Sequence, residues 1–467
     1  MTEASPERAN MGFIGAIVAV ATIGGFLFGY DSGAVNGTQN GLKAAFELSP
    51  GGLGFTVGSL LIGCFIGAFF AGTLAESMGR RNVMRIASVL FLGGALVQGF
   101  ASSQTIFVIS RMIGGMAVGA ASVLSPAYIS EVAPASIRGR MTTVQQIMII
   151  AGLTAAAIVN YFFQQAAGND STHVLAFGLS AWRWMFLAQA IPAAVFLVAL
   201  FFVPESPRYL VARGRLDEAS GVLARLFGNS VASAKLDEIR ASFSTDHRPR
   251  LSDVLAPGTI FRPIVWAGLI IAVFQQLVGI NVIFYYGATL WQAAGFSESQ
   301  ALLTTVINNS ISLAACFITV GLVDKVGRKP LLLIGSAGMA IMLFIMVFAF
   351  STGTLVGTTL TLPGHMGMVA VTAALTYAAL FNISWGPVMW VMLGEMFPNQ
   401  IRGSALAVAG FAQWFANYLI AQSFPVMAQW SLAGSYTFYA VSAVISFFLV
   451  QKFIHETKGK ELEEMHG

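Results

Sequence analysis

The feature that most limits the fold of this chain is a series of twelve apolar segments, each long enough to cross a membrane as a helix. Soluble domains carry about 25% charged residues, whereas this chain carries 10%, with 56% hydrophobic residues. Such a chain cannot cover itself with polar surface, so the sequence predicts an all-α membrane protein. The predicted spans lie at 12–34, 53–75, 84–101, 105–127, 142–163, 182–203, 264–287, 300–323, 331–351, 366–392, 403–424 and 433–454.

One long polar stretch, from Pro204 to Arg262, separates six spans from the other six. Within it, "GRLDEASGVLARLF" and "ASAKLDEIRASF" have the spacing of amphipathic helices. We therefore expect four parts: an N-terminal six-helix half (1–203), linker helices (204–262), a C-terminal six-helix half (263–454) and a tail (455–467).

The lysines and arginines predict the orientation of the spans, because cytoplasmic loops are rich in both. With the N-terminus in the cytoplasm, Lys43 and Arg183 fall at the outer side, Arg111 falls within a span, and the other basic residues are cytoplasmic. The excess of positive charge is thus a topology signal, and it needs no nucleic-acid partner. The sequence predicts a multi-pass protein of the plasma membrane, in bacteria the inner membrane, with both termini in the cytoplasm.

The two halves repeat short loop sequences. "LAESMGRRNVM" at 74–84 matches "LVDKVGRKPLL" at 322–332, and "SEVAPASIRG" at 130–139 matches "GEMFPNQIRG" at 394–403. Equivalent loops in two six-span halves indicate a duplicated fold with a pseudo-twofold axis along the membrane normal. A substrate site is then expected near the midplane, between the halves.

Two opposite charges fall at similar depth in the apolar spans. Asp31 lies toward the outer end of span 1, and Arg111 lies about 10 Å below the start of span 4 at 1.5 Å per residue. Charges inside a membrane protein are expected to pair, and only Asp31 of the two can change its protonation state. The alternative is that Asp31 lies past the end of its span, among lipid headgroups. No histidine is an alternative titrating group inside the spans, because all of them fall in or beside loops and tails: His173, His247, His365, His455 and His466.

Amides recur within the apolar spans of both halves, beside aromatic residues. They occur in "VQQIMII", "FQQLVGIN", "INNSIS", "FNISWGPVMW" and "AQWFANY". A single amide in a span usually hydrogen-bonds a neighbouring helix. Several together can line a site for a hydroxyl-rich, uncharged ligand, because each amide both donates and accepts, while aromatic faces cover the C–H face of a ring. The pattern favours a sugar or cyclic polyol.

The chain resembles the sugar porters of the major facilitator superfamily over nearly its whole length. The motifs are "GRR" at 79–81, "GRK" at 327–329, "PESPRYL" at 204–210, "QQLVGIN" at 275–281, "SWGPVMW" at 384–390 and "HETKGKE" at 455–461. The resemblance implies the 6+6 major facilitator fold with cytoplasmic helices between the halves. It also implies a set of sugar contacts: Phe28, Gln146, Gln275, Gln276, Asn281, Tyr285, Phe381, Trp390, Gln413 and Asn417.

The chain departs from the pattern of the family at a few of these positions. Leu153 stands where some proton-coupled members have a glutamine, and Ser312 stands where an asparagine is expected. Asn309, one turn away from Ser312, can substitute for it, and Asn382 adds a polar group that many members lack. The departures leave the particular sugar open among glucose, galactose, xylose and a cyclic polyol.

The resemblance further implies salt bridges between the halves that hold the cytoplasmic side closed in the outward-facing state. Glu131 with Arg138 and Glu395 with Arg402 occupy matching loop positions, as do Glu76 with Arg80 and Asp324 with Arg328. The predicted gate comprises Glu76, Arg80, Glu131, Arg138, Glu205, Arg208, Asp324, Arg328, Glu395 and Arg402. The alternative is that these charges are solvated and serve only to orient the protein in the membrane.

These observations predict a secondary active transporter that imports a monosaccharide with a proton by rocking two halves about a central site. The proton-coupling residues would be Asp31 and Arg111. A proton-independent facilitator of the same fold and a membrane sugar sensor are the alternatives. The chain has no HExxH, no GxSxG and no nucleophile beside a histidine, so an enzyme is not expected. We expect no cofactor and no metal, and a monomer in contact with membrane lipid.

Overall fold

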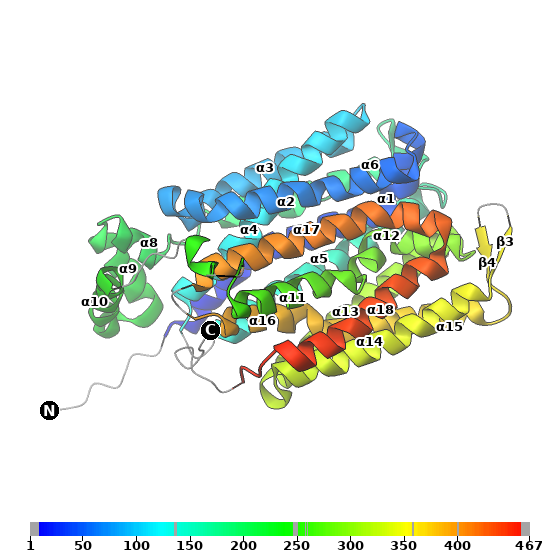
Figure 1. Cartoon of the computed structure of the whole chain (residues 1–467). Helices are drawn as coiled ribbons and strands as arrows, with labels where there is room; N and C mark the ends of the chain where they lie inside the picture. Colours follow the sequence, from blue (N-terminus) through cyan, green and yellow to red (C-terminus); the bar gives the residue numbers. More distant parts are fainter. Residues whose placement is uncertain are drawn as a thin grey trace.

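The computed structural model describes residues 9–134, 138–245, 251–256, 258, 260–356, 359–398 and 401–458. Within these ranges it contains twelve helical segments long and apolar enough to cross a membrane, one at each predicted position. They run side by side as a long bundle (Figure 1). The twelve-span prediction is confirmed.

The N-terminal six-helix half is formed by the first seven helices, two of which make up its last span. The helices are α1 (Met11–Phe46), α2 (Pro50–Met78), α3 (Arg80–Phe100), α4 (Gln104–Val132), α5 (Arg138–Ala166), α6 (Ala181–Leu187) and α7 (Ala190–Ala199). A short hairpin of β1 (Val174–Ala176) and β2 (Leu179–Ser180) precedes α6.

The C-terminal six-helix half contains two spans that are each divided into two helices. The helices are α11 (Pro263–Leu277), α12 (Ile280–Ala293), α13 (Glu298–Val326), α14 (Arg328–Ser351), α15 (Met366–Ile383), α16 (Trp385–Met396), α17 (Arg402–Trp430) and α18 (Leu432–Phe453). A second hairpin, β3 (Thr354–Val356) with β4 (Thr359–Thr361), joins α14 to α15.

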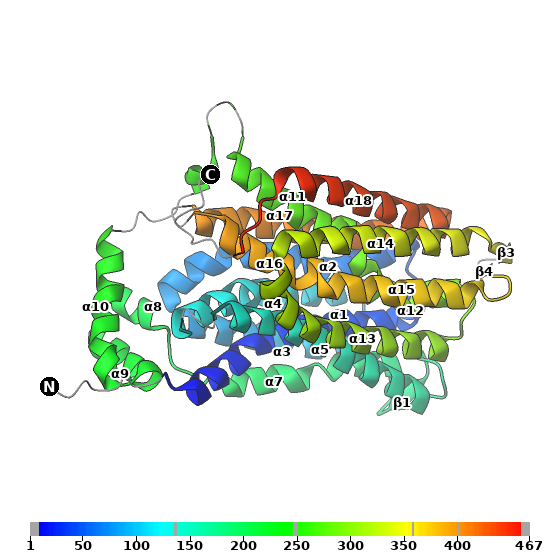
Figure 2. The same cartoon turned by 90° about the horizontal axis from the view of Figure 1, so that it is seen from below.

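Short helices connect the halves: α8 (Pro207–Ala212), α9 (Leu216–Phe227), α10 (Asn229–Thr245) and the 3-10 turn η2 (Leu251–Val254). Helices α8–α10 lie at one end of the bundle, here called the linker end. The β hairpins lie at the opposite end, here called the hairpin end (Figure 2). The Arg225 guanidinium lies 4.3 Å from the Phe13 ring centroid, so α9 docks on the start of α1.

Span 1 is longer than the sequence predicted. The predicted span ended at residue 34, but α1 continues to Phe46. The extra turns carry polar residues, among them Asn36 and Gln39, which hydropathy assigns to a loop. They are buried because they hydrogen-bond the opposite half.

Span 7 is interrupted where a glycine adopts a backbone conformation that other residues avoid. Gly279 has φ +84° and separates α11 from α12. A Cβ at this position would lie 2.6 Å from the Tyr439 ring, so both the backbone angle and the close packing require glycine. After the break, Asn281 at the start of α12 hydrogen-bonds Gln276 at the end of α11.

The position of α4 in the N-terminal half depends on glycines that let two helices touch. Gly63 and Gly67 of α2 face Gly115 and Gly119 of α4, and a Cβ at any of the four would meet backbone of the facing helix at 2.0–2.1 Å. Small residues at such crossings allow close backbone approach in membrane helices. This contact places Arg111 of α4 against the inside of α1 and α2.

The halves meet mainly along α2 with α17, α5 with α13, and α1 with α12, and α5 also contacts α16. The α1–α12 contact is polar and lies toward the hairpin end. Ala288 N donates to Asn36 Oδ1 at 2.8 Å, Asn40 Nδ2 donates to Gln292 Oε1 at 3.0 Å, and Gln39 bonds the Tyr285 carbonyl. In this conformation the hairpin end is closed.

Candidate functional site

The two charges predicted to pair inside the bundle do so. Arg111 Nη1 lies 3.1 Å from Asp31 Oδ2 and 3.3 Å from Oδ1, and the side chains are 2% and 0% exposed. Arg111 Nη2 donates to the Val57 carbonyl of α2 at 3.2 Å. Helix α1 continues about 22 Å beyond Asp31, so this carboxylate lies inside the protein rather than among headgroups.

Such a pair is sensitive to the loss of either partner. Removing one member of a buried ion pair leaves an uncompensated charge and typically costs about 3–5 kcal/mol. Adding a proton to Asp31 cancels its charge without removing the side chain. Protonation therefore weakens the contact between α1 and α4 while leaving the packing in place.

Four of the predicted sugar-contact amides form one hydrogen-bonded chain in the C-terminal half. Asn281 Nδ2 donates to Gln276 Oε1 at 2.5 Å, Gln276 Nε2 donates to Gln275 Oε1 at 3.1 Å, and Gln413 Nε2 donates to the same oxygen at 3.3 Å. Gln275 Nε2 donates in turn to the Trp385 and Gly386 carbonyls of α16. The chain thus joins α11, α12, α16 and α17 around one point.

A second polar contact lies between this amide chain and α1. Asn417 Nδ2 donates to the Tyr285 hydroxyl at 3.1 Å, and the carbonyl of the same tyrosine accepts from Gln39 of α1. Gln413 Oε1 and Asn417 Oδ1 are buried and accept no hydrogen bond from the described residues. Buried acceptors of this kind are uncommon, and they provide unused capacity for a ligand hydroxyl.

Aromatic rings close the same region from both halves. Phe28 of α1 meets Trp414 of α17 edge to face, with ring centroids 5.1 Å apart. Trp414 was not among the predicted residues, although it lies in "AQWFANY" between Gln413 and Asn417. Its place next to two polar candidates was the available signal.

The remaining predicted contacts are placed less centrally. Asn309 Nδ2 donates to the Leu153 carbonyl of α5 at 3.1 Å, which joins the two halves. Asn382 Nδ2 donates to Ala378 O within α15 at 2.8 Å, and Phe381 is buried on the same helix. Gln146 and Trp390 are half-buried on α5 and α16, two helices that contact each other across the halves. A role in ligand contact stays a prediction for these five, as it does for every other predicted sugar contact.

The charged residues at the linker end pair differently from the prediction. Arg80 Nη2 bonds Glu131 Oε1 at 2.9 Å, and Arg328 bonds Glu395 at 2.7 and 3.0 Å. Each of these bridges lies within one half in this conformation, and the bridges between the halves that we expect in the outward-facing state stay a prediction. The observed bridges stay within a half because the arginine starts the third or ninth span and the glutamate ends the fourth or tenth, which are neighbours in the same half.

Three gate candidates have side chains outside the part of the chain that the structure describes: Arg138, Asp324 and Arg402. Glu76 is exposed on α2, and its carbonyl accepts from Arg213 at 3.2 Å. Arg208 lies in α8, where Ser206 caps the helix. Their predicted role in the gate stays a prediction.

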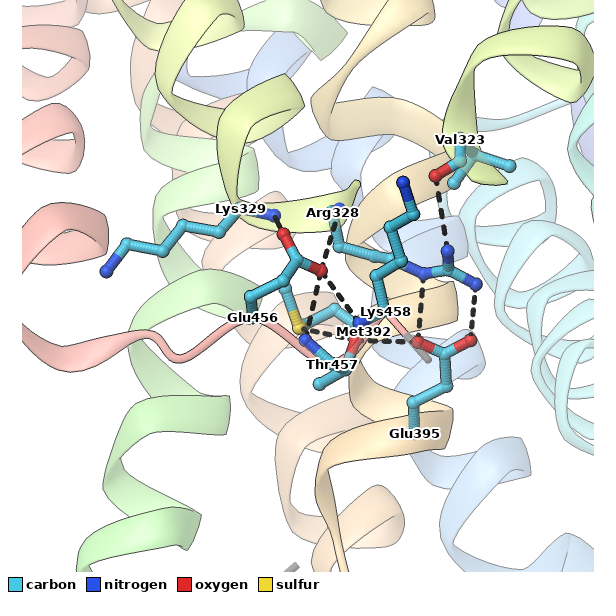
Figure 3. Close-up of polar contacts among 8 residues, drawn as sticks. All are labelled: Val323, Arg328, Lys329, Met392, Glu395, Glu456, Thr457 and Lys458. Carbon is cyan, nitrogen blue, oxygen red and sulfur yellow. Dashed lines mark hydrogen bonds and ion pairs between the residues drawn. The ribbon is translucent and has the colours of Figure 1, made fainter. Parts of the chain in front are cut away.

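A second carboxylate lies beside each of these bridges, at an equivalent position in the two halves. Glu205 Oε1 accepts from the backbone N–H groups of Arg80 and Arg81 at 3.0 and 3.2 Å. In the other half, Glu456 accepts from the N–H groups of Arg328 and Lys329, each at 3.0 Å (Figure 3). Both carboxylates cover a helix N-terminus, where negative charge is favourable.

The residue after each of these glutamates extends the network. Ser206 bonds Glu131, and Thr457 Oγ1 donates to Glu395 Oε2 at 2.7 Å. The sequence reasoning did not single out Ser206, Glu456 or Thr457. The sequence signal that could have found them is the Glu-Ser of "PES" and the Glu-Thr of "HET", each of which follows the last span of its half.

Glu456 lies beyond α18, at the linker end, and its environment changes its acidity. Partial burial raises the pKa of this carboxyl, but hydrogen bonds from the N–H groups of Lys458, Arg328, Lys329 and Thr457 outweigh burial. The net result is a pKa below the ordinary value, so the charged form is held. Across the described ranges, no group of three or more His, Cys, Asp or Glu side chains could hold a metal ion.

Twelve spans in two six-helix halves, with a buried ion pair and a polar site between the halves, define a membrane transporter of the major facilitator fold. The family model "Sugar (and other) transporter" matches residues 17–467, and the chain belongs to that family.

Its relatives and neighbours in structure cover almost the whole chain. It is 44% identical to the "Glucose transport protein" of Synechocystis sp. over 99% of this chain and 98% of that one. It is 41% identical to the "D-xylose-proton symporter" of Escherichia coli over 98% and 96%. The solved structure of the proton:xylose symporter XylE bound to 6-bromo-6-deoxy-D-glucose matches with a TM-score of 0.80 and 38% identity, over 98% and 99%.

Proposed function

We propose that this protein imports a monosaccharide together with a proton, by alternating access of one central site. The sugar is a hexose or pentose such as glucose, galactose or xylose. The observation that carries the proposal is that one helix, α1, bears both Asp31, paired with Arg111, and Phe28, whose ring meets Trp414 at the candidate sugar site. Two relatives whose names specify a glucose and a xylose-proton transporter support it.

The amides and rings suit a neutral, hydroxyl-rich ligand. The chain of Gln275, Gln276 and Asn281 offers donors and acceptors whose orientation can reverse, because an amide carries both. The edge-to-face contact of Phe28 and Trp414 supplies an apolar wall. No acidic or basic side chain is among the predicted sugar contacts, which favours an uncharged sugar over a sugar acid or sugar phosphate.

Proton coupling follows from the geometry of α1. With Asp31 charged, its contact with Arg111 holds α1 against α4 inside the N-terminal half. Protonation weakens that contact. The same helix bonds the Tyr285 carbonyl of the other half through Gln39. A proton on Asp31 can thereby alter how the halves meet at the site.

The membrane topology that fits this function places the linker end in the cytoplasm. The basic residues gather there, as cytoplasmic segments require, and the hairpin end then faces outward. We further propose that the protein is a monomeric carrier in the inner membrane of a bacterium, and that it is not an enzyme. Single cysteines introduced at each end and labelled in intact cells with a membrane-impermeant thiol reagent would test the orientation.

The test of the function is uptake by purified protein in proteoliposomes. When the external buffer is acidic and the interior of the vesicles is alkaline, radiolabelled D-xylose or D-glucose should accumulate above its external concentration. The external medium should become more alkaline as the sugar enters. Sugar equilibration without accumulation would indicate the facilitator. Tight binding with no uptake of either sugar would indicate a sensor. A competition panel of hexoses, pentoses and inositol then identifies the preferred substrate.

A further inference from the structure

The β1–β2 hairpin has an aromatic residue in its turn, where the backbone conformation disfavours one. Ala176 of β1 pairs with Leu179 of β2, so only Phe177 and Gly178 form the turn. Both have positive φ, +51° and +74°, as the type I′ turn of a two-residue hairpin requires. Asparagine followed by glycine is favoured in such turns, and a bulky residue with positive φ is an outlier. A contact of the Phe177 ring has to offset this unfavourable conformation.

The rest of the protein provides little of that contact. Phe177 is 92% exposed, and Val174, at the start of β1, is 63% exposed. Among the large hydrophobic residues of the described ranges, none is more exposed than Phe177. From Val174 to Trp182 the sequence carries no charged residue. The hairpin therefore presents an apolar tip that no part of the described chain covers.

Hydrogen bonds and packing hold this tip against the side of the sixth span. The Trp184 indole Nε1–H donates to the Ala176 carbonyl at 3.2 Å, and the ring centroids of Trp184 and Phe177 lie 6.0 Å apart. Leu175 packs on a small core of α5 and α6 residues. Trp184 lies about 4.5 Å along the helix axis from Ala181, the first residue of α6. The tip is thus level with the first turn of the span rather than beyond it.

The hairpin adjoins a surface that the membrane covers. β1 lies at the edge of the bundle, on the side along which α7 runs (Figure 2). Ile191, Val195 and Val198 of α7 are 55–70% exposed, as apolar residues of a span are when they face lipid. The apolar tip therefore continues the lipid-facing surface of the sixth span.

We propose that the β1–β2 hairpin is a membrane anchor that inserts Phe177 into the leaflet at the hairpin end. The partner is the lipid surface, at the boundary between headgroups and acyl chains, where tryptophan is also enriched. Trp184 holds the tip in place and uses its one polar group on the hairpin, so neither ring brings an unsatisfied donor into lipid. Burial of the Phe177 ring offsets the unfavourable turn. The inference goes beyond transport and does not rest on it.

The first test measures the depth of an added tryptophan in liposomes. We expect Phe177→Trp to be quenched by lipids brominated on the acyl chain near the headgroup, and to be shielded from acrylamide in the water. Thr361→Trp is the matched control, because Thr361 is exposed on β4, in the polar hairpin that projects past the helix ends (Figure 1). It should show the opposite behaviour. The native tryptophans contribute equally to both variants.

The second test separates lipid contact from turn chemistry by hydrogen exchange of the hairpin amides in liposomes. Asparagine relieves the turn, so turn chemistry alone predicts slower exchange in Phe177→Asn. Loss of the anchor predicts the reverse, about tenfold faster exchange, because burial of a phenylalanine ring corresponds to a factor of ten or more. Phe177→Leu keeps an apolar side chain and the unfavourable turn, and should exchange as wild type does.

Several outcomes would overturn the proposal. Equal quenching of Phe177→Trp and Thr361→Trp, by either quencher, would show that the tip has no special contact with lipid. Shielding of Phe177→Trp from both quenchers would show that protein, such as a second copy of this chain, covers the tip instead. Exchange that slows in Phe177→Asn would show that Phe177 contributes no anchoring.

Discussion

At the scale of single residues, Asp31 is the side chain on which the proposed proton coupling would depend. Its substitution by asparagine keeps the volume and makes the neutral state permanent. We expect Asp31→Asn to bind sugar and exchange it downhill, but to accumulate none against a gradient, because the return of the empty carrier no longer depends on a proton. Uptake into proteoliposomes with an imposed pH gradient measures this. Accumulation at the wild-type level would show that coupling lies elsewhere.

Gln275 makes the most contacts of the predicted sugar residues, since its oxygen accepts from two amides and its nitrogen donates to two carbonyls. Gln275→Ala should weaken monosaccharide binding up to roughly tenfold, which corresponds to the loss of one hydrogen bond between neutral groups. Equilibrium binding of labelled sugar is the measurement. Gln164→Ala removes an equally buried amide of α5 away from the site and should bind as wild type does. Equal losses in both variants would argue for a general packing defect.

At the scale of elements, the hydropathy pattern predicts where helices lie but not where they break. The twelve spans could be predicted because each must bury apolar side chains over a membrane thickness. The break at Gly279 depends on the Tyr439 ring of a distant helix, and no local signal contains that contact. Likewise, the partners of Arg80 and Arg328 lie at the ends of other helices, which meet them only in the folded chain.

The same limit applies to the candidate site. Asp31 and Arg111 could be paired from depth alone, because each span fixes the height of its residues. Trp414 had only its place between Gln413 and Asn417 as a signal, since many aromatic residues occupy the spans and only the packing brings its ring to Phe28.

The contact between the tail and α14 should depend on pH through Glu456. Its pKa in the folded protein is lowered, so its contribution is complete above the ordinary value of about 4.3. The contribution is lost as the pH falls through the lower, folded pKa. Hydrogen exchange at the Arg328 and Lys329 amides, corrected for intrinsic rates, should lose protection in that acid range.

Glu456→Gln is the matched variant for this contact. It should show the reduced protection at neutral pH already, with little further change on acidification. Protection that falls equally with acid in wild type and Glu456→Gln would assign the effect to another group.

At the scale of the whole molecule, the halves are held together at the hairpin end by neutral hydrogen bonds. Asn36→Ala removes the acceptor of the Ala288 N–H and should favour opening of that end, by up to about tenfold in the ratio of states. Spin labels on the β1–β2 and β3–β4 hairpins would report a larger population of long distances. An unchanged distance distribution would remove Asn36 from the closure.

The salt bridges that stay inside each half have a mechanical consequence. Separation of the halves stretches neither Arg80–Glu131 nor Arg328–Glu395, so both can serve as clasps that keep each half rigid while it tilts. The protein should then tolerate division into two polypeptides. A cut between residues 245 and 251 leaves both clasps, both carboxylate caps and the whole α8–α10 cluster intact. When the two halves are co-expressed as separate chains, we expect them to assemble through the interface along which they move during transport.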